Sequence, residues 1–120
     1  MLVDDNSDDN FYHERVIKKN DLADSVIAMT DAMEALNYLR KENPLDPELI
    51  FLDINMPGMN GWDFLQEYKQ LKKSGTIIIM LTTSENQDDK SKALATGIVS
   101  DFRTKPLSKE MLEDILSKHY

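Results

Sequence analysis

The sequence predicts an α/β fold: a single domain, residues 1–120, in which five β-strand–α-helix units form a doubly wound, parallel five-stranded sheet. Two observations lead to this prediction. First, residues 49–52 and 77–81 are wholly apolar, which is typical of strands covered on both faces. Second, strand-like segments alternate with amphipathic helical segments along the whole chain. Such alternation implies parallel strands joined by right-handed crossovers, with helices on both faces.

Composition narrows the class of protein. The 120 residues include 22 Asp and Glu against 14 Lys and Arg, a formal net charge of −8, which argues against nucleic-acid backbone or anionic membrane as the main partner. There is no cysteine, so disulfides, a thiolate nucleophile and a cysteine metal site are excluded. No run approaches the ~18 apolar residues of a membrane span, and the first residues lack a signal-peptide pattern. We therefore expect a soluble, cytoplasmic protein.

The first half of the chain contains three predicted strands. A short apolar run over residues 1–3 ends in Asp4-Asp5, and residues 7–9 are expected to cap and begin a helix that reaches about residue 20. The inward stripe of that helix is expected to hold Phe11 or Tyr12, Val16 and Ile17. Residues 25–29 form the second predicted strand. Thr30 and Asp31 then cap a helix with apolar positions 32, 35, 36 and 39, and residues 43–47 form a stiff loop.

The second half supplies the other elements. The strand at 49–52 runs into Asp53 and breaks at Pro57-Gly58, and Asn60 is expected to cap a helix from residue 61 to about 73. A strand over 76–81 follows. The spacing of residues 84–87 predicts a capping box for the next helix, in which only residues 93–95 are apolar. A strand over 98–104 and a helix capped by Ser108 complete the pattern.

Polar groups follow four of the predicted strands. These groups are Asp4-Asp5, Asp53, Thr82-Thr83-Ser84 and Lys105. Each alone has an ordinary structural explanation, such as a helix cap or a surface turn. Because the carboxyl ends of parallel strands share one edge, where open α/β sheets bind ligands, their coincidence favours a functional site.

The carboxylates at this edge suggest a metal. Two unit charges ~4 Å apart repel by about 4 kcal/mol at an effective dielectric constant near 20, so three gathered aspartates need raised pKa values or a cation. With only oxygen ligands available, Mg²⁺ is the expected ion. Mg²⁺ beside a lysine and a threonine hydroxyl is typical of phosphoryl transfer, and Asp53 is the carboxylate best placed to receive the group.

These residues also carry a family resemblance. The chain resembles a response-regulator receiver domain of two-component signalling, and is similar to the stand-alone chemotaxis-type regulators. The matching motifs are Val-Asp-Asp-Asn at 3–6, Leu-Asp-Ile-Asn-Met-Pro-Gly-Met-Asn-Gly at 52–61, Met-Leu-Thr at 80–82 and Phe-Arg-Thr-Lys-Pro at 102–106. Four motifs in order over essentially the whole chain make the resemblance specific. It implies the flavodoxin-like strand order 2-1-3-4-5.

The resemblance also implies roles at the site. Asp53 would be the phospho-acceptor. Asp5 and Asp53 would ligate Mg²⁺ directly, Asp4 would act largely through water, and the backbone carbonyl of Asn55 would complete the protein ligands.

Three further residues match the family's switch and phosphate-binding positions. Thr82 would be the switch hydroxyl, and Phe102 would be the switch aromatic that turns inward when Thr82 moves. Lys105 would pair with a phosphoryl oxygen, and its peptide bond to Pro106 is usually cis in this family.

The expected partners follow from the same resemblance. A histidine kinase or phosphotransfer protein would donate the phosphoryl group, and a downstream protein would bind the face of the fourth helix, fifth strand and fifth helix. We expect Mg-dependent self-phosphorylation and self-dephosphorylation at Asp53 but no turnover enzyme, and no direct binding of nucleic acid or membrane. Arg103 departs from the family's aliphatic strand residue, so either that face is exposed or Arg103 makes its own contact. The last helix lacks the arginine of the DNA-binding regulators' receiver dimers, so a monomer or weak dimer is expected.

Other interpretations remain open. A phosphorylation-independent interaction module on the same scaffold is the main alternative. A haloacid-dehalogenase-type phosphatase needs a second acid where this chain has Asn55, and a flavin binder would need a phosphate loop where Asp4-Asp5 would repel phosphate. His13 and His119 lack a relay motif and are expected to be partly exposed helix residues.

Overall fold

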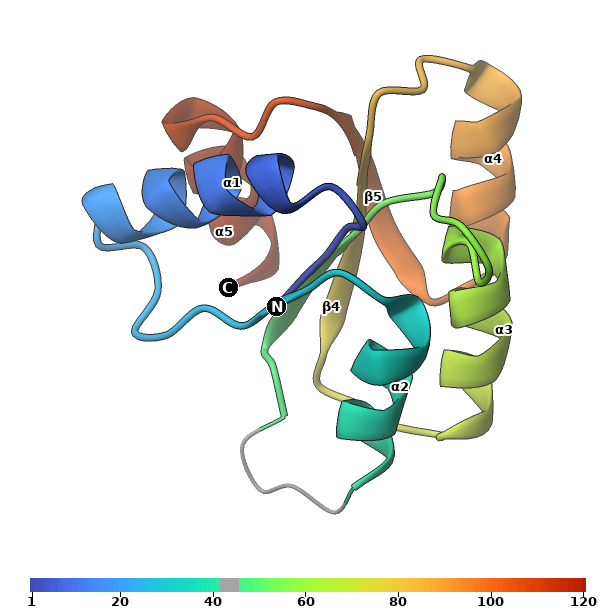
Figure 1. Ribbon diagram of the computed structural model, residues 1–120. Coiled ribbons are helices and arrows are strands. Elements are labelled where there is room, and N and C mark those ends of the chain that lie inside the picture. Colours follow the sequence, from blue (N-terminus) through green and yellow to red (C-terminus); the bar gives the residue numbers. More distant parts are fainter. Residues whose placement is uncertain (42–45) are drawn as a thin grey trace.

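The computed structural model describes residues 1–41 and 46–120, and its five parallel strands form one sheet in the order β2-β1-β3-β4-β5 (Figure 1). The strands are β1 (Leu2–Val3), β2 (Ala28–Met29), β3 (Leu49–Leu52), β4 (Ile77–Thr82) and β5 (Val99–Thr104). The helices are α1 (Ser7–Lys19), α2 (Ala32–Arg40), α3 (Gly61–Gln70), α4 (Gln87–Ala95) and α5 (Lys109–His119). The predicted α/β fold and its strand order are confirmed.

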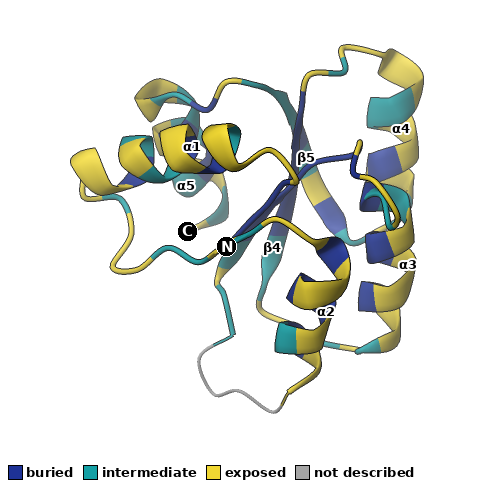
Figure 2. Cartoon of the chain, viewed as in Figure 1, coloured by how far each residue is buried: buried dark blue, intermediate teal, exposed yellow. Residues whose placement is uncertain are grey.

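Helices cover both faces of the sheet, α1 and α5 on one side and α2, α3 and α4 on the other (Figure 1). Successive strand residues therefore enter different cores. Ile50 and Leu52 pack with α2 and α3, whereas Phe51 between them packs with α1 and α5. Figure 2 shows the result: the strands are mostly buried, and the outer surfaces of the helices are exposed.

The helix caps partly differ from the prediction. Asn6, rather than Ser7, caps α1, because its extended backbone (φ −86°, ψ 105°) lets its side chain accept bonds from the amides of Asp8 and Asp9. Asn86 caps α4 by accepting from the Asp88 amide at 2.8 Å, so the capping box expected at residues 84–87 is wrong. The predicted caps are confirmed at Asp31, Asn60 and Ser108.

The buried side of α1 also corrects the prediction. Its buried residues are Asn10, His13 and Ile17, while Phe11 and Tyr12 are 64% and 51% exposed. The expectation of an inward aromatic and of a partly exposed His13 is therefore wrong. Positions 10, 13 and 17 lie on one side of a helix, and here two of the three are polar because they adjoin the polar end of the sheet.

Element boundaries differ by a few residues from those predicted. β2 covers only residues 28–29 rather than 25–29, and α3 ends at Gln70 rather than near residue 73, shortly before Lys72 takes a φ of +52°. Most of the loop predicted at 43–47 lies outside the described residues. Within residues 1–41 and 46–120, no helix has both the length and the apolar character needed to span a membrane.

Candidate functional site

Asp53 lies directly after β3 and is held by its own backbone and by α3. Its amide donates to the Val3 carbonyl at 3.0 Å, and its Oδ1 accepts from the Ile54 amide at 2.9 Å. The Gly61 amide, which begins α3, donates to the Ile54 carbonyl at 2.8 Å. A Cβ on Gly61 would lie 2.5 Å from the Asp53 carbonyl oxygen, so only glycine allows this close packing. The Asp53 carboxylate thus has a fixed position, with 7% of the residue exposed.

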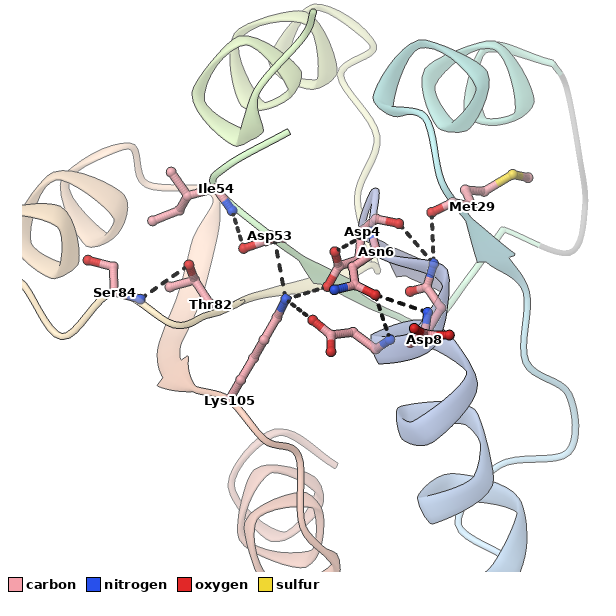
Figure 3. Close-up of polar contacts among 11 residues, drawn as sticks. Asp4, Asn6, Asp8, Met29, Asp53, Ile54, Thr82, Ser84 and Lys105 are labelled. Carbon is pink, nitrogen blue, oxygen red and sulfur yellow. Dashed lines mark hydrogen bonds and ion pairs between the residues drawn. The ribbon is translucent and has the colours of Figure 1, made fainter. Parts of the chain in front are cut away.

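Lys105 reaches the same edge of the sheet from the end of β5. We call this edge, where the strand ends carry Asp4, Asp5, Asp53, Thr82 and Lys105, the rim. Its amide donates to the Thr82 carbonyl at 2.8 Å, and its peptide bond to Pro106 is cis, as the resemblance implies. Its Nζ lies 2.5 Å from Asp4 Oδ2, 2.9 Å from Asp9 Oδ2 and 3.4 Å from Asp53 Oδ2. Figure 3 shows these contacts converging on the ammonium group. The predicted convergence of four strand ends is confirmed for β1, β3 and β5 by these ion pairs, and the end of β4 adjoins them through the Thr82 carbonyl.

The rim carries more negative than positive charge. Asp4, Asp5 and Asp53 each offer one carboxylate oxygen, and these three atoms lie within 4.8 Å of one another. Asp9 adds a fourth carboxylate. Asp4, Asp9 and Asp53 pair with the ammonium of Lys105, whereas among the described contacts Asp5 has no ion pair with it. A compact set of oxygen donors at an open sheet edge fits Mg²⁺, which prefers a few carboxylates together with waters.

Burial and charge perturb the ionisable groups of the rim. Burial raises the pKa of Asp53, and the neighbouring charge of Asp4 raises it further. The Lys105 ammonium, the Thr82 hydroxyl and the Ile54 amide act in the opposite direction on that pKa without cancelling the rise. For Lys105, burial lowers the pKa, but the hydrogen bonds to Asp4 and Asp9 outweigh burial and raise it overall. Lys105 is therefore a cation, and an additional positive charge at the rim would favour the ionised form of Asp53.

The other predicted residues occupy distinct layers. Thr82, the last residue of β4, is fully buried, and its Oγ1 accepts from the Ser84 amide at 3.4 Å. Phe102 is 7% exposed on β5 and belongs to the core beneath α2, α3 and α4. Asn55 is exposed, two residues past Asp53 in the same loop. Asp53, Thr82 and Lys105 therefore lie at the rim, and Phe102 lies in the core below it.

Three residues of the first half of α1 were not predicted as neighbours of the site. They are Asp9, which pairs with Lys105, and Asn10 and His13, which line a small cavity together with Asp4 and Asp53. A signal existed in the sequence, since these residues follow the Asp4-Asp5 pair by one to two helical turns. The spacing of apolar residues, from which the inward side of the helix was predicted, does not reveal these positions because they are polar.

Comparisons with known proteins agree with this geometry. The family model described as "Response regulator receiver domain" matches residues 1–117. The response regulator Rcp1 of Synechocystis is 34% identical over 94 residues, covering 74% of this chain and 64% of Rcp1. A protein-glutamate methylesterase/protein-glutamine glutaminase of Burkholderia thailandensis is 36% identical over 107 residues, 89% of this chain but only 29% of that protein. The crystal structure of a two-component response regulator from Cytophaga hutchinsonii superposes with a TM-score of 0.91 at 30% identity, covering 98% of this chain and 92% of that one.

Proposed function

The chain belongs to the response-regulator receiver family, and on that premise we propose that residues 1–120 accept a phosphoryl group on Asp53 in a Mg-dependent step. The observation that carries the proposal is the rim itself. One buried carboxylate, Asp53, stands beside a lysine ammonium at 3.4 Å and within 4.8 Å of two further carboxylates. The proposed donor is a phosphorylated histidine of a kinase or phosphotransfer protein. We also propose a cytoplasmic location.

The proposed step exchanges one bond for another. An Asp53 carboxylate oxygen attacks the phosphorus, the P–N bond to the donor histidine breaks, and the imidazole nitrogen keeps the electron pair and takes a proton. The product is an acyl phosphate on Asp53. Attack by water on that phosphorus would return the carboxylate and inorganic phosphate, so the domain would also reverse its own modification.

The residues of the rim would have separate roles in this step. Asp4, Asp5 and Asp53, with the Asn55 carbonyl, would hold Mg²⁺, which supplies positive charge to the phosphoryl oxygens. Lys105 would move from Asp4 and Asp9 to a phosphoryl oxygen, and Thr82 would donate to another. The raised pKa of Asp53 supports these roles. A carboxylate that is buried beside a like charge is stabilised in its ionised form by each cation that binds near it.

A change at Thr82 would be transmitted to α4, β5 and α5. Ala93 is the one α4 residue that is buried, so few apolar contacts hold this helix. The Lys92 Nζ lies 4.3 Å from the centre of the Trp62 ring, a cation–π contact between α4 and α3. Weakly held elements are the ones that move most readily. Because Phe102 is already buried in this structure, a shift of α4 rather than an inward turn of Phe102 would change the surface presented to a downstream protein.

The direct test is modification by a small phosphodonor. Incubation with acetyl phosphate and Mg²⁺ is expected to add the mass of one phosphoryl group to the wild type, at Asp53. Asp53→Asn should not gain it, whereas Asp24→Asn, a matched change at an exposed aspartate in the loop after α1, should behave as the wild type. If the wild type gains no phosphate, the phosphorylation-independent interaction module becomes the better interpretation. If Asp53→Asn gains as much as the wild type, Asp53 is not the acceptor.

A further inference from the structure

Asn10, on the first turns of α1, joins the ends of two strands. The residue is 4% exposed, and its Nδ2 donates to the Asp4 carbonyl at 2.9 Å and to the Met29 carbonyl at 3.4 Å. Both partners are acceptors. A flipped amide would place Oδ1 against two carbonyl oxygens, so the orientation of the amide group is fixed by its surroundings.

The fixed orientation leaves Asn10 Oδ1 on the side away from the two carbonyls, and Asn10 lines a small cavity. None of the described residues donates a hydrogen bond to this buried oxygen. The cavity measures about 10 Å³ and is lined by the polar residues Asp4, Asn10, His13 and Asp53 and by apolar residues of β1, β3 and β4. That is room for one water molecule, and a buried amide oxygen without a donor is the kind of group that internal waters satisfy.

His13 provides a second polar partner for such a water. It is 3% exposed and lies one turn after Asn10 on the same side of α1. Burial lowers the pKa of His13, and the positive charge of Lys105 lowers it further, although Asp9 and Asp4 act in the opposite direction. The imidazole is therefore neutral at pH 7, with one N–H donor and one acceptor nitrogen.

We infer that one ordered water bridges Asn10 Oδ1 and the His13 imidazole beneath the rim, and that Asn10 is a positioning residue for the Asp4-Asp5 pair. The peptide groups on both sides of Asp4 are held: its amide donates to the Met29 carbonyl at 3.0 Å, and its carbonyl accepts from Asn10 Nδ2. The water fixes the other end of the Asn10 amide. The positioning part of the inference rests on the Mg²⁺ site of the proposed function; the water part does not.

A crystal structure at high resolution tests the water directly. The expected result is a water within hydrogen-bond distance of both Asn10 Oδ1 and a ring nitrogen of His13, and its loss in His13→Leu. A wild-type cavity without water, or a direct bond between His13 and Asn10, would overturn this part. Neither result depends on whether the protein is phosphorylated.

Calorimetric titration with Mg²⁺ alone tests the positioning role. Asn10→Leu keeps the shape of the side chain but cannot hold the Asp4 carbonyl, and should weaken Mg²⁺ binding about tenfold, as is typical when a supporting contact of a metal ligand is lost. The matched control is Asn20→Ala at the other end of α1, where Asn20 Nδ2 donates to the Val16 carbonyl at 2.7 Å. This control should lower the unfolding temperature while leaving Mg²⁺ affinity unchanged.

The outcomes are distinguishable. Weaker Mg²⁺ binding in Asn10→Leu but not in Asn20→Ala supports the positioning role, whereas loss of thermal stability in both with equal Mg²⁺ affinity overturns it. If Asn10→Leu does not fold, the smaller change Asn10→Ser is measured in the same way and judged by the same criterion. Failure of the wild type to bind Mg²⁺ contradicts the metal site of the proposed function, and leaves the crystallographic test of the water to decide the rest.

Discussion

Two cations only two residues apart, Arg103 and Lys105, stand in opposite kinds of ion cluster. Arg103 binds Asp101 Oδ2 at 2.7 Å and Asp114 Oδ2 at 2.5 Å on the surface between β5 and α5, and Lys118 approaches the same Asp114 oxygen at 3.2 Å. Two cations there face two carboxylates. The alternative that Arg103 makes its own contact, rather than facing solvent alone, is the one the structure supports.

Lys105 lies in a cluster that has more negative than positive charges. Its side chain is 9% exposed, against 21% for Arg103. Among the described residues it is the one cation that pairs with the carboxylates of Asp4, Asp9 and Asp53, beside which Asp5 also lies. A balanced, solvent-facing cluster is typical of structural pairing, whereas a buried excess of one charge costs stability and persists where a ligand supplies the missing charge. Charge balance and burial together distinguish the site from the surface network.

The largest expected effect comes from removing the Lys105 ammonium. Lys105→Met keeps the length of the stem but leaves the carboxylates of the rim without a cation, and should lower the free energy of unfolding by about 2–3 kcal/mol near pH 7. This is below the usual range for a buried pair because Asp9 is 37% exposed. Urea denaturation measures the change, and Mg²⁺ should restore part of it. A loss no larger than that of Arg103→Met would remove the distinction between the two clusters.

Mg²⁺ should stabilise the wild type, because the folded rim gathers carboxylates that are apart in the unfolded chain. At a free concentration ten times the dissociation constant the gain is about 1.4 kcal/mol. Thermal unfolding with and without Mg²⁺ measures it. Arg103→Met should respond as the wild type does, and Asp53→Asn should respond less. An equal response in Asp53→Asn would place the ion elsewhere.

Asp53→Asn should itself stabilise the metal-free protein at neutral pH. Burial raises the pKa of Asp53 above its ordinary value of 3.8, so the folded chain holds this proton more tightly than the unfolded chain does. The stability contributed by Asp53 is then fully present below about that value and is lost as the pH rises through the folded-state pKa. The advantage of Asp53→Asn over the wild type should thus be largest at neutral pH and vanish in acid. Urea denaturation across a pH series measures it, with Asp24→Asn as the control that shows no such trend.

The smallest effects belong to the surface cluster. Arg103→Met should lower the midpoint of thermal unfolding slightly, and added salt should shrink the difference because exposed pairs are screened. Lys118→Ala should change the midpoint by less still, since Arg103 continues to pair with Asp114. Thermal scans at low and high salt compare the variants. A salt-insensitive loss in Arg103→Met would indicate a buried role instead.

The sequence was sufficient for the fold and for the strand ends of the site. The apolar runs identified β3 and β4, and the polar residues after the strands marked Asp4, Asp5, Asp53 and Lys105 as neighbours, because the rule that parallel strands end at one edge needs only their order.

The inner side of α1 could not be predicted in the same way. Asn10 and His13 are buried because they satisfy polar groups at the strand ends, which depends on tertiary contacts, while Phe11 and Tyr12 are left outside. The predicted cap of α1 was wrong for a local reason. Asn6 and Ser7 are both good cap residues, and the extended backbone at Asn6 decides between them.

A crystal structure with Mg²⁺ and beryllium fluoride, a mimic of the phosphoryl group, tests the assignment of the Lys105 cluster most directly. We predict beryllium bonded to a carboxylate oxygen of Asp53, Lys105 Nζ hydrogen-bonded to one fluorine and released from Asp4 and Asp9, and Thr82 Oγ1 hydrogen-bonded to a second fluorine. Beryllium fluoride bound away from Asp53, or Lys105 still paired with Asp4 and Asp9 beside it, would contradict the role of this rim in phosphoryl transfer.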